Sequence, residues 1–278
     1  MRNGYHIIDA HCHIYPDSLA HRAAENISEF YDGIDFCGGD VGALLQLMER
    51  QGIDFSIVNS AAMKPHQVES VNQFILESCE AHPDKLAPVG TLHPDSTHME
   101  HDLQFITDHG FHGIKMHPDM LDIPLDDPRF LRIYALCQEA DVPVLLHTGD
   151  RRYDNTNPNR FGPVVAKFPA LTFIGGHFAG RDFFCEAADT LHQYQNLYAD
   201  CSSAFNQLTP EQALYCIRTY TADHILFGTD HPVFTPGYDL DYLFSLPLTA
   251  EELGKILSGT AQTVYRVLPP WETPACAE

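Results

Sequence analysis

The sequence predicts an α/β protein with a single domain, a (β/α)8 TIM barrel that spans residues 1–278. Three observations predict this fold: the length, the alternation of strand-like and helix-like stretches, and the even spacing of the strands. A barrel of this class takes about 250 residues, and the chain has 278. Near-continuous apolar strands that alternate with helices are typical of a parallel sheet covered by helices.

Short apolar or β-branched runs predict the strands of the barrel. After the first run they recur roughly every 25–31 residues, which is the spacing expected of consecutive βα units. The predicted strands are His6–Ala10, Phe55–Asn59, Leu86–Leu92, Gly113–Met116, Pro143–His147, Thr172–Gly175, Leu197–Asp200 and Ile225–Gly228.

Amphipathic stretches between these runs predict helices, at Val41–Gln51, Val71–Ala81, Arg129–Ala140 and Glu211–Tyr220. The longest interval, Ile14–Asp40, is predicted to be a loop that shapes access to the active end of the barrel. An open, doubly wound sheet is the alternative fold. It normally has a glycine-rich phosphate loop after its first strand, whereas this chain has two histidines there.

The composition excludes several classes of function. The chain is 44% hydrophobic and carries a net charge of −22, which repels nucleic acids and anionic membranes. A small anionic substrate remains open, because a local basic pocket can outweigh the global charge. The eight cysteines include no C-x-x-C pair, and no apolar run resembles a signal peptide or a membrane span. We therefore expect a soluble, cytoplasmic protein without a nucleic acid or membrane partner.

The strongest local signal is the pair His11 and His13 at the first strand. Residues i and i+2 of a strand point to the same face, so two imidazoles could chelate one cation. Two unrelated polar residues at a strand end are the alternative. The sequence places His147, His177 and Asp230 at the C-terminal ends of three other predicted strands, on the face where barrel active sites are built.

Three imidazoles and a carboxylate suit a divalent metal, with zinc as the first expectation, manganese and iron as alternatives, and one ion rather than two. Such a metal can lower the pKa of bound water to roughly 7. Asp230 could be a metal ligand, a general base toward that water, or both. His177 is interpreted as a proton shuttle or a donor to an oxyanion, with a second metal as the alternative.

Together these motifs resemble the amidohydrolase superfamily, within its amidohydrolase 2 group of metal-dependent hydrolases and decarboxylases. The motifs are DAHCH, LLHTG, GGHFAG and LFGTDHP, with ILSGTAQTVYRVL similar to the closing helix of the family. The resemblance implies His11, His13, His147 and Asp230 as metal ligands, with His177 near the reaction centre.

Several basic residues are candidates for binding substrate. Lys115 and His117 are predicted to share the inward face of the fourth strand. Lys115 could face a substrate carboxylate or phosphate, could be carboxylated and bridge two metals, or could pair with barrel carboxylates. Arg151 and Arg152 follow the fifth strand and are predicted to bind an anionic substrate, since guanidinium groups bind carboxylates bidentately. Salt bridges within a surface loop are their alternative, as for Arg160.

Three further polar residues are expected near the site. Asp9 could orient a ligand imidazole or cap its strand end, His231 could contact substrate or pack beneath the metal loop, and His93 is interpreted as a loop residue that lines the site.

The sequence therefore favours a hydrolase that uses metal-activated water on a small, anionic amide, lactone or ester, or on a phosphoester. A metal-dependent decarboxylase or other lyase on the same scaffold is the alternative, because its metal ligands would be the same. A non-catalytic binder is a third hypothesis. A metal-dependent nuclease is disfavoured by the acidic charge and by Lys115 in place of a glutamate. A homodimer is one expectation, because dimers are common among such barrels.

Overall fold

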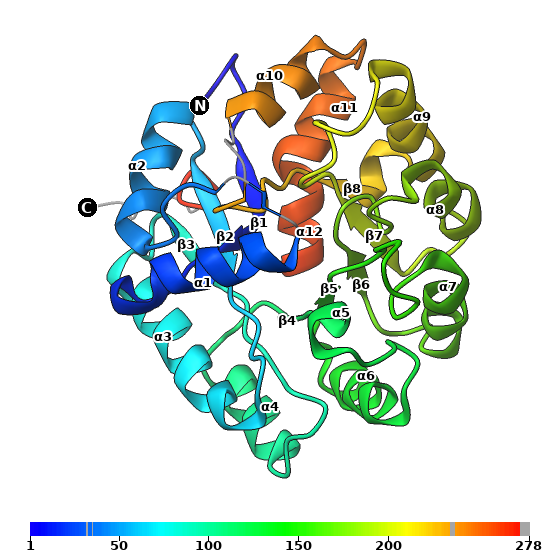
Figure 1. The fold of residues 1–278 in the computed structure, drawn as a ribbon. Helices are drawn as coiled ribbons and strands as arrows, with labels where there is room; N and C mark the ends of the chain where they lie inside the picture. The colour runs from blue at the N-terminus through cyan, green and yellow to red at the C-terminus, as the bar shows by residue number, and fades with distance from the viewer. Residues whose placement is uncertain (32, 35, 234–236, 273–278) are drawn as a thin grey trace.

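The computed structural model describes residues 1–31, 33–34, 36–233 and 237–272. Within these residues, eight strands surround a central axis and are enclosed by helices (Figure 1). Each strand overlaps one of the predicted runs. The strands are β1 (Ile8–His13), β2 (Phe55–Asn59), β3 (Leu86–Pro88), β4 (Ile114–Met116), β5 (Val144–Leu146), β6 (Phe173–Gly175), β7 (Leu197–Asp200) and β8 (Ile225–Leu226).

Helices follow the strands in chain order and form the outer layer. They are α1 (Asp17–Phe30), α2 (Val41–Gln51), α3 (Val68–Ala81), α4 (Met99–Asp108), α5 (Pro118–Leu121), α6 (Pro128–Ala140), α7 (Pro158–Lys167), α8 (Phe184–Leu191), α9 (Pro210–Tyr220), α10 (Gly237–Ser245), α11 (Ala250–Gly254) and α12 (Thr260–Tyr265). The four predicted helices correspond to α2, α3, α6 and α9, with ends that differ by at most three residues.

The strands pair in parallel and close into a barrel. The pairings run from β1 to β3 and from β4 to β8. Backbone hydrogen bonds join the two sheets at both seams. Gly90 N donates to Gly113 O at 2.9 Å between β3 and β4, and Ala10 N donates to Phe227 O at 2.9 Å between β1 and β8. The predicted (β/α)8 TIM barrel is therefore confirmed, and the open doubly wound alternative is wrong.

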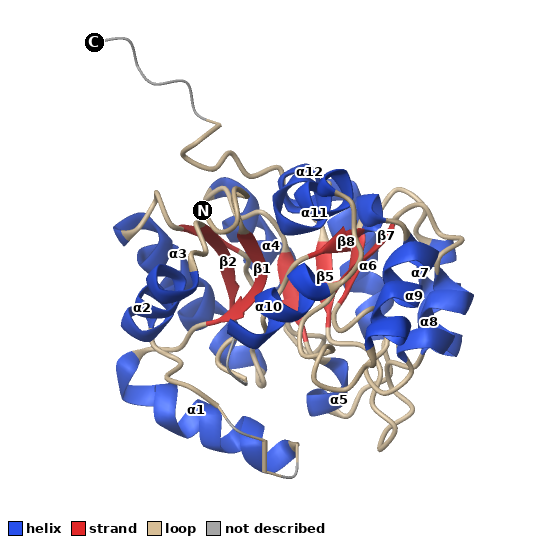
Figure 2. Cartoon of the chain, turned by 90° about the horizontal axis from the view of Figure 1, so that it is seen from above, coloured by secondary structure: helices blue, strands red, loops and turns tan. Residues whose placement is uncertain are grey.

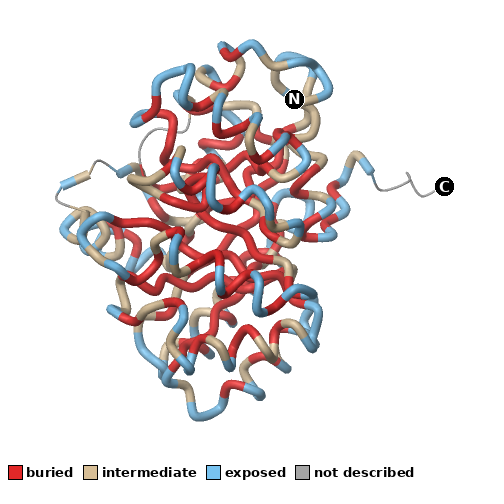
Figure 3. Tube along the Cα trace, turned by 90° about the vertical axis from the view of Figure 1, so that its right-hand side faces the viewer, coloured by how far each residue is buried: buried red, intermediate tan, exposed pale blue. Residues whose placement is uncertain are grey.

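The barrel interior is filled by alternate strand residues. Leu145 of β5, Ile174 of β6 and Leu226 of β8 belong to one buried cluster, together with Val264 and Tyr265 of α12. The helix therefore closes one end of the barrel. A larger apolar cluster lies between the strands and the outer helices, and Figure 3 shows the buried segments gathered in the centre of the molecule. No described helix is long and apolar enough to cross a membrane.

The first strand differs from its prediction in its bounds and its alternation. It runs to His13 instead of ending at Ala10, and a bulge near its middle gives it one residue more than the facing part of β2. A bulge shifts the alternation of side chains by one position. Ile8 and Ala10 therefore lie in the interior cluster before the bulge, while His11 contacts interior side chains after it.

The long interval Ile14–Asp40 is not only a loop, since it contains the 14-residue helix α1. The helix buries Ala20 and Ala24 on one side and leaves Leu19 half exposed. Figure 2 shows α1 and α5 at one end of the barrel, with α11 and α12 at the other. The segment thus places a helix over the end where the strands finish, which agrees with the predicted role in access.

Gly149 lies where the loop after β5 contacts the loop after β6. Its φ is +75°, and an added Cβ would lie 2.6 Å from Arg181 N. That nitrogen donates to Thr148 O at 2.8 Å. We expect Gly149→Ala to destabilise the fold by about 3 kcal/mol, the sum of a left-handed alanine and overpacking against backbone. The melting temperature should fall by roughly 6–12 °C.

The matched control is Gly254→Ala. That glycine ends α11 with a φ of −60°, and an added Cβ would meet no atom within 4 Å. Its melting temperature should stay within a few degrees of the wild type. Equal melting temperatures for the two variants would contradict the close approach of these loops.

Candidate metal centre and active site

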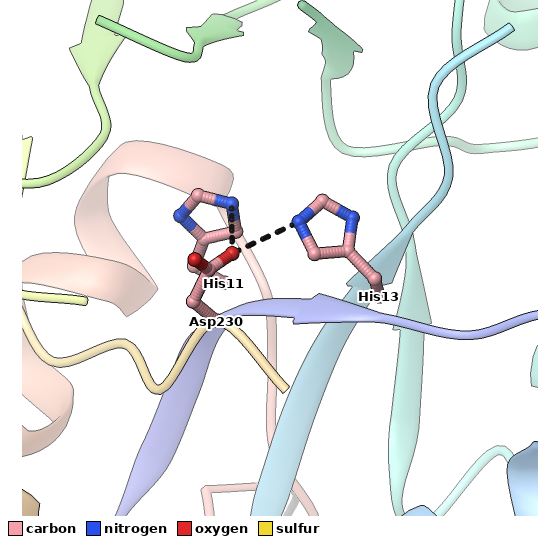
Figure 4. A group of neighbouring side chains, drawn as sticks. All are labelled: His11, His13 and Asp230. Carbon is pink, nitrogen blue, oxygen red and sulfur yellow. Dashed lines mark hydrogen bonds and ion pairs between the residues drawn. The ribbon is translucent and has the colours of Figure 1, made fainter. Parts of the chain in front are cut away.

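His11, His13 and Asp230 converge inside the end of the barrel. One donor atom of each residue lies within 4.8 Å of the others, and among the described residues they form the group suited to a metal ion. His13 Nε2 is 3.1 Å and His11 Nε2 is 3.5 Å from Asp230 Oδ1 (Figure 4). The two imidazoles come from β1 and the carboxylate from the loop after β8, so residues far apart in the sequence build one cluster.

The orientation of His11 is set by Asp200, the last residue of β7. His11 Nδ1 lies 2.8 Å from Asp200 Oδ2. Because a carboxylate only accepts, Nδ1 carries the hydrogen and the lone pair of Nε2 is left for the cluster. Burial and the positive charge of Lys115 lower the pKa of His11 to about 4. The ring is therefore neutral at neutral pH, which is the form that binds metals.

The Asp230 carboxylate is held from both sides. Oδ1 faces His13, and Oδ2 accepts from Ser203 Oγ at 2.7 Å. Burial alone would raise the pKa of Asp230, but the hydrogen bond with His13 and the interactions with the His177 and His11 rings lower it well below its usual range. Asp230 is therefore ionised at neutral pH, and its φ of +63° is a left-handed conformation that costs energy for a residue other than glycine.

A chain of hydrogen bonds fixes the tautomers of His177 and His147. His177 Nδ1 donates to the carbonyl of Ser202 at 2.9 Å. Its Nε2 must then accept from His147 Nδ1, 3.0 Å away. The lone pair of His147 Nε2 faces the Tyr31 hydroxyl at 3.2 Å. His147 thus presents a nitrogen that could bind a cation, but the structure does not bring it into the group of His11, His13 and Asp230.

The turn that carries His177 has an unusual backbone. His177, Phe178 and Ala179 have φ values of +60°, +52° and +58°. Each left-handed residue costs roughly 1–2 kcal/mol. Hydrogen bonds stabilise the turn, because Asp200 accepts from His177 N at 3.1 Å through Oδ1 and from Phe178 N at 2.6 Å through its carbonyl oxygen. Strain of this kind clusters at functional sites.

Lys115 and His117 both lie at the site, as their alternation on the fourth strand predicts. Lys115 is 1% exposed, and its Nζ is 2.9 Å from His11 Nε2. Burial lowers its pKa to about 8, against the opposite influence of nearby carboxylates. The His117 ring stacks on His147 with 4.0 Å between centroids, and its Nε2 is 2.9 Å from the Tyr31 hydroxyl.

The arginines after β5 are bound by protein groups. Arg152 forms a bidentate pair with Asp150, with distances of 3.0 and 2.7 Å. Arg160 pairs with Asp126 and Asp154. The salt bridges proposed as their alternative are therefore present in the structure.

Arg151 is likewise occupied, because its Nη2 donates to Asp182 O at 2.8 Å. The structure leaves neither Arg151 nor Arg152 with a guanidinium group free of protein partners, so their predicted binding of substrate stays untested.

The remaining polar candidates contribute to the frame of the site. Asp9 is buried and accepts from Thr229 N at 3.0 Å and from Thr229 Oγ1 at 2.6 Å. It therefore ties β1 to the loop after β8 and does not hold an imidazole. His231 is 1% exposed and lies 3.5 Å from Cys37 Sγ through Nδ1. His93 is buried and accepts from Asp95 N at 3.1 Å.

Two residues at the site were not predicted from the sequence: Asp200, which orients His11, and Tyr31, whose hydroxyl contacts His117 and His147. The signal for Asp200 was available, since Leu197–Asp200 is an apolar run that ends in a carboxylate like the run before Asp230. The signal for Tyr31 was absent, because its position depends on the fold of the segment that contains α1.

Comparison with known proteins places this set of residues in a family. A family model described as amidohydrolase matches residues 8–267. The chain belongs to the amidohydrolase family. The match covers the strands, the three-residue cluster and the tautomer-fixing residues of this amidohydrolase, and it confirms the resemblance seen in its sequence motifs.

Solved structures share the fold at low sequence identity. An uncharacterised TIM-barrel protein from Bordetella bronchiseptica is 21% identical, with a TM-score of 0.78 and coverage of 94% of this chain and 98% of its own. The 5-carboxyvanillate decarboxylase from Sphingomonas paucimobilis is 13% identical, with a TM-score of 0.75 and coverage of 95% of this chain and 100% of its own.

A dihydroxybenzoic acid decarboxylase from Polaromonas was solved with bound manganese and the inhibitor 2-nitroresorcinol. It is 18% identical, with a TM-score of 0.73 and coverage of 98% of this chain and 100% of its own. At these identities the comparisons show a shared fold. No curated protein matches the sequence of this amidohydrolase.

Proposed function

We propose that this chain is a metal-dependent decarboxylase, a lyase that removes CO2 from an aromatic carboxylic acid. The observation that carries the proposal is a set of cation-binding donors beside a buried amine. His11 and Lys115 are 0% and 1% exposed, and the side chains of His13 and Asp230 are 12% and 14% exposed. Loss of CO2 needs no water, and a site with little solvent exposure favours desolvation of a reacting carboxylate.

The similar structures support the same choice. The hydrolase that the sequence favours first is not confirmed. The decarboxylase alternative better fits the similar structures from Sphingomonas and Polaromonas, both of which are decarboxylases.

The donor set fits one divalent cation. Two imidazole nitrogens and a carboxylate oxygen lie close together. The ionised carboxylates of Asp230 and Asp200 would balance the positive charge of the cation. His147 is the fourth proposed ligand, because its Nε2 keeps a lone pair. Nitrogen and oxygen donors accept several metals. Zinc is the metal expected from the sequence, but the Polaromonas structure holds manganese, so we propose Mn²⁺ as the first metal to test.

The protein groups around the cation have separate tasks. When bound, the metal would supply a Lewis acid that stabilises negative charge on the substrate. Lys115 adds positive charge at the same place. The bond between the ring carbon and the carboxylate carbon breaks, CO2 leaves, and a proton joins the ring carbon. We assign that proton transfer to His177, whose Nδ1 is held by Ser202. Its Nε2, which accepts from His147 Nδ1 in this structure, would take up a proton from solvent and deliver it to the ring carbon as CO2 leaves.

The direct test is release of CO2 by the Mn²⁺-loaded protein. We expect turnover of at least one hydroxylated aromatic acid in a panel that includes 2,6-dihydroxybenzoate and 5-carboxyvanillate. A chelator should abolish turnover, and added Mn²⁺ should restore it. A parallel panel of lactones and esters tests the hydrolase. Hydrolysis in that panel, with no CO2 from any acid, would overturn the proposed decarboxylase.

Asp200→Asn tests how the site is held. The asparagine keeps the shape but loses the charge that fixes the Nδ1 hydrogen of His11. We expect Mn²⁺ affinity, measured by calorimetry, to fall roughly 10–100-fold, the usual cost of losing a carboxylate that orients a metal-binding histidine. The exposed Asp84 provides the control variant Asp84→Asn. Unchanged affinity in Asp200→Asn would show that His11 is oriented by other groups.

A further inference from the structure

Arg181 differs from Arg152 and Arg160 in forming no ion pair with any acid that the structure describes, and from Arg151 in having no hydrogen bond at Nε. It follows the left-handed turn after β6, and its backbone nitrogen donates to Thr148 O. Its Nε is buried and has no hydrogen-bond partner among the described residues. Across residues 1–31, 33–34, 36–233 and 237–272, no carboxylate lies within ion-pair distance of its guanidinium group. By contrast, Arg152 and Arg160 each hold an aspartate.

The guanidinium group lies over the aromatic ring that covers the site. Its Cζ is 4.1 Å from the centroid of the Tyr31 ring. The hydroxyl of the same ring contacts His117 Nε2 at 2.9 Å and His147 Nε2 at 3.2 Å. The positive charge of Arg181 also acts to lower the pKa values of Tyr31, His147 and Asp119. Arg181 is therefore a cation at the active end of the barrel, one aromatic ring away from two imidazoles.

The acids near Arg181 form their described contacts with other groups, and Asp119 Oδ1 has no hydrogen-bond partner among the described residues. Asp150 binds Arg152 through both carboxylate oxygens. Asp119 accepts from Thr156 Oγ1 at 2.6 Å, and burial raises its pKa to about 7. A partly buried guanidinium group with no carboxylate is costly unless a ligand completes it. Its planar fork matches a carboxylate bidentately.

We propose that Arg181 binds a carboxylate group of the substrate and so determines the specificity for acids, while the face of Tyr31 supports the guanidinium group. The inference rests on the proposed function, because it names the residue that selects the aromatic acid. It assigns this role to the loop after β6, whereas the sequence places it on Arg151 and Arg152 after β5.

The test compares acids with their neutral amides by calorimetry on the Mn²⁺-loaded protein. The probes are benzoate, 2,6-dihydroxybenzoate and 5-carboxyvanillate. Each is paired with the neutral analogue in which every carboxylate is replaced by a carboxamide. We expect the wild type to bind at least one acid roughly 10–100-fold more tightly than its amide, as expected for hydrogen bonds to a charged group. In Arg181→Gln this preference should fall to within about twofold.

Two further variants test whether a change in this preference arises from the guanidinium group of Arg181. Arg181→Lys keeps the charge but loses the fork, so it should retain an intermediate preference. Arg160→Gln removes an arginine that is held by Asp126 and Asp154, and it should leave the preference unchanged. Mn²⁺ affinity and melting temperature check that each variant is folded. If Arg181→Gln does not fold, an Arg181→Lys variant with the full wild-type preference would overturn the proposal.

Other outcomes separate this inference from the proposed function. A wild type with no preference for any acid, or Arg181→Gln with the full preference, would overturn the role of Arg181. If CO2 is still released when either result is obtained, the proposed decarboxylase activity stands. Conversely, a preference that depends on Arg181, without CO2 release from any acid, would support Arg181 and count against decarboxylation.

Discussion

Asp230→Asn is expected to lower kcat by at least about 1,000-fold, because it removes the anionic ligand of the proposed metal. The carboxylate contacts His13 and Ser203 and lies 3.5 Å from His11 Nε2. An asparagine keeps these positions, but its NH2 group cannot accept from Ser203 or His13 in the same way, and the negative charge is lost. Mn²⁺ affinity should fall together with turnover.

The measurement for Asp230→Asn combines steady-state turnover at saturating Mn²⁺ with the metal content of the purified protein. The control is Asp223→Asn, which removes an exposed carboxylate that pairs with Lys255. That variant should keep turnover and metal content within about twofold of the wild type. Wild-type turnover in Asp230→Asn would be incompatible with Asp230 as a ligand or a proton acceptor.

The second large effect is expected for Lys115→Met. The variant retains a long apolar side chain but removes the only cation that contacts His11 among the described residues. Loss of one charged group aimed at developing negative charge typically costs roughly 100–1,000-fold in kcat. We therefore expect kcat to fall by that amount, while the protein still binds one Mn²⁺ per chain.

Metal stoichiometry separates the two functional interpretations of Lys115. If the lysine acts as a cation toward the substrate, both the wild type and Lys115→Met should hold one Mn²⁺. A wild type with two Mn²⁺ that drops to one in the variant would favour a carboxylated lysine that bridges metals. Lys167→Met, at the exposed end of α7, serves as the control and should change neither turnover nor stoichiometry.

The barrel could be predicted because its signals are local. Apolar runs at regular spacing mark the strands, and amphipathic stretches mark the helices. The bulge in β1 could not be predicted, since it depends on the pairing of β1 with β2. The helix α1 was not predicted, because the long interval that contains it also has glycines and a proline, which favour loops.

The candidate site was predicted in part, for a similar reason. His11 and His13 lie at the end of β1, and His147, His177 and Asp230 follow other strands, so parallel pairing brings all of them to one end of the barrel. Which nitrogen each imidazole offers depends on partners such as Asp200 and Ser202, whose contacts arise only in the folded chain.

The arginines show the limit of sequence proximity. Three arginines close to His147 in the sequence are candidates for binding an anionic substrate, but Arg152 and Arg160 pair with aspartates, and Arg151 binds a backbone carbonyl. Arg181 is close to the site through the turn after β6. That none of the described acids pairs with it depends on the folded arrangement of Asp119 and Asp150.

The central claim is that His11, His13 and Asp230 bind one metal ion inside the barrel. The most direct test is anomalous diffraction at the manganese edge from crystals of the Mn²⁺-loaded protein. We predict one strong peak bounded by His11 Nε2, His13 Nε2 and a carboxylate oxygen of Asp230, with His147 Nε2 turned toward it. A map with no peak there at saturating Mn²⁺, or with its main peak elsewhere, would contradict the account.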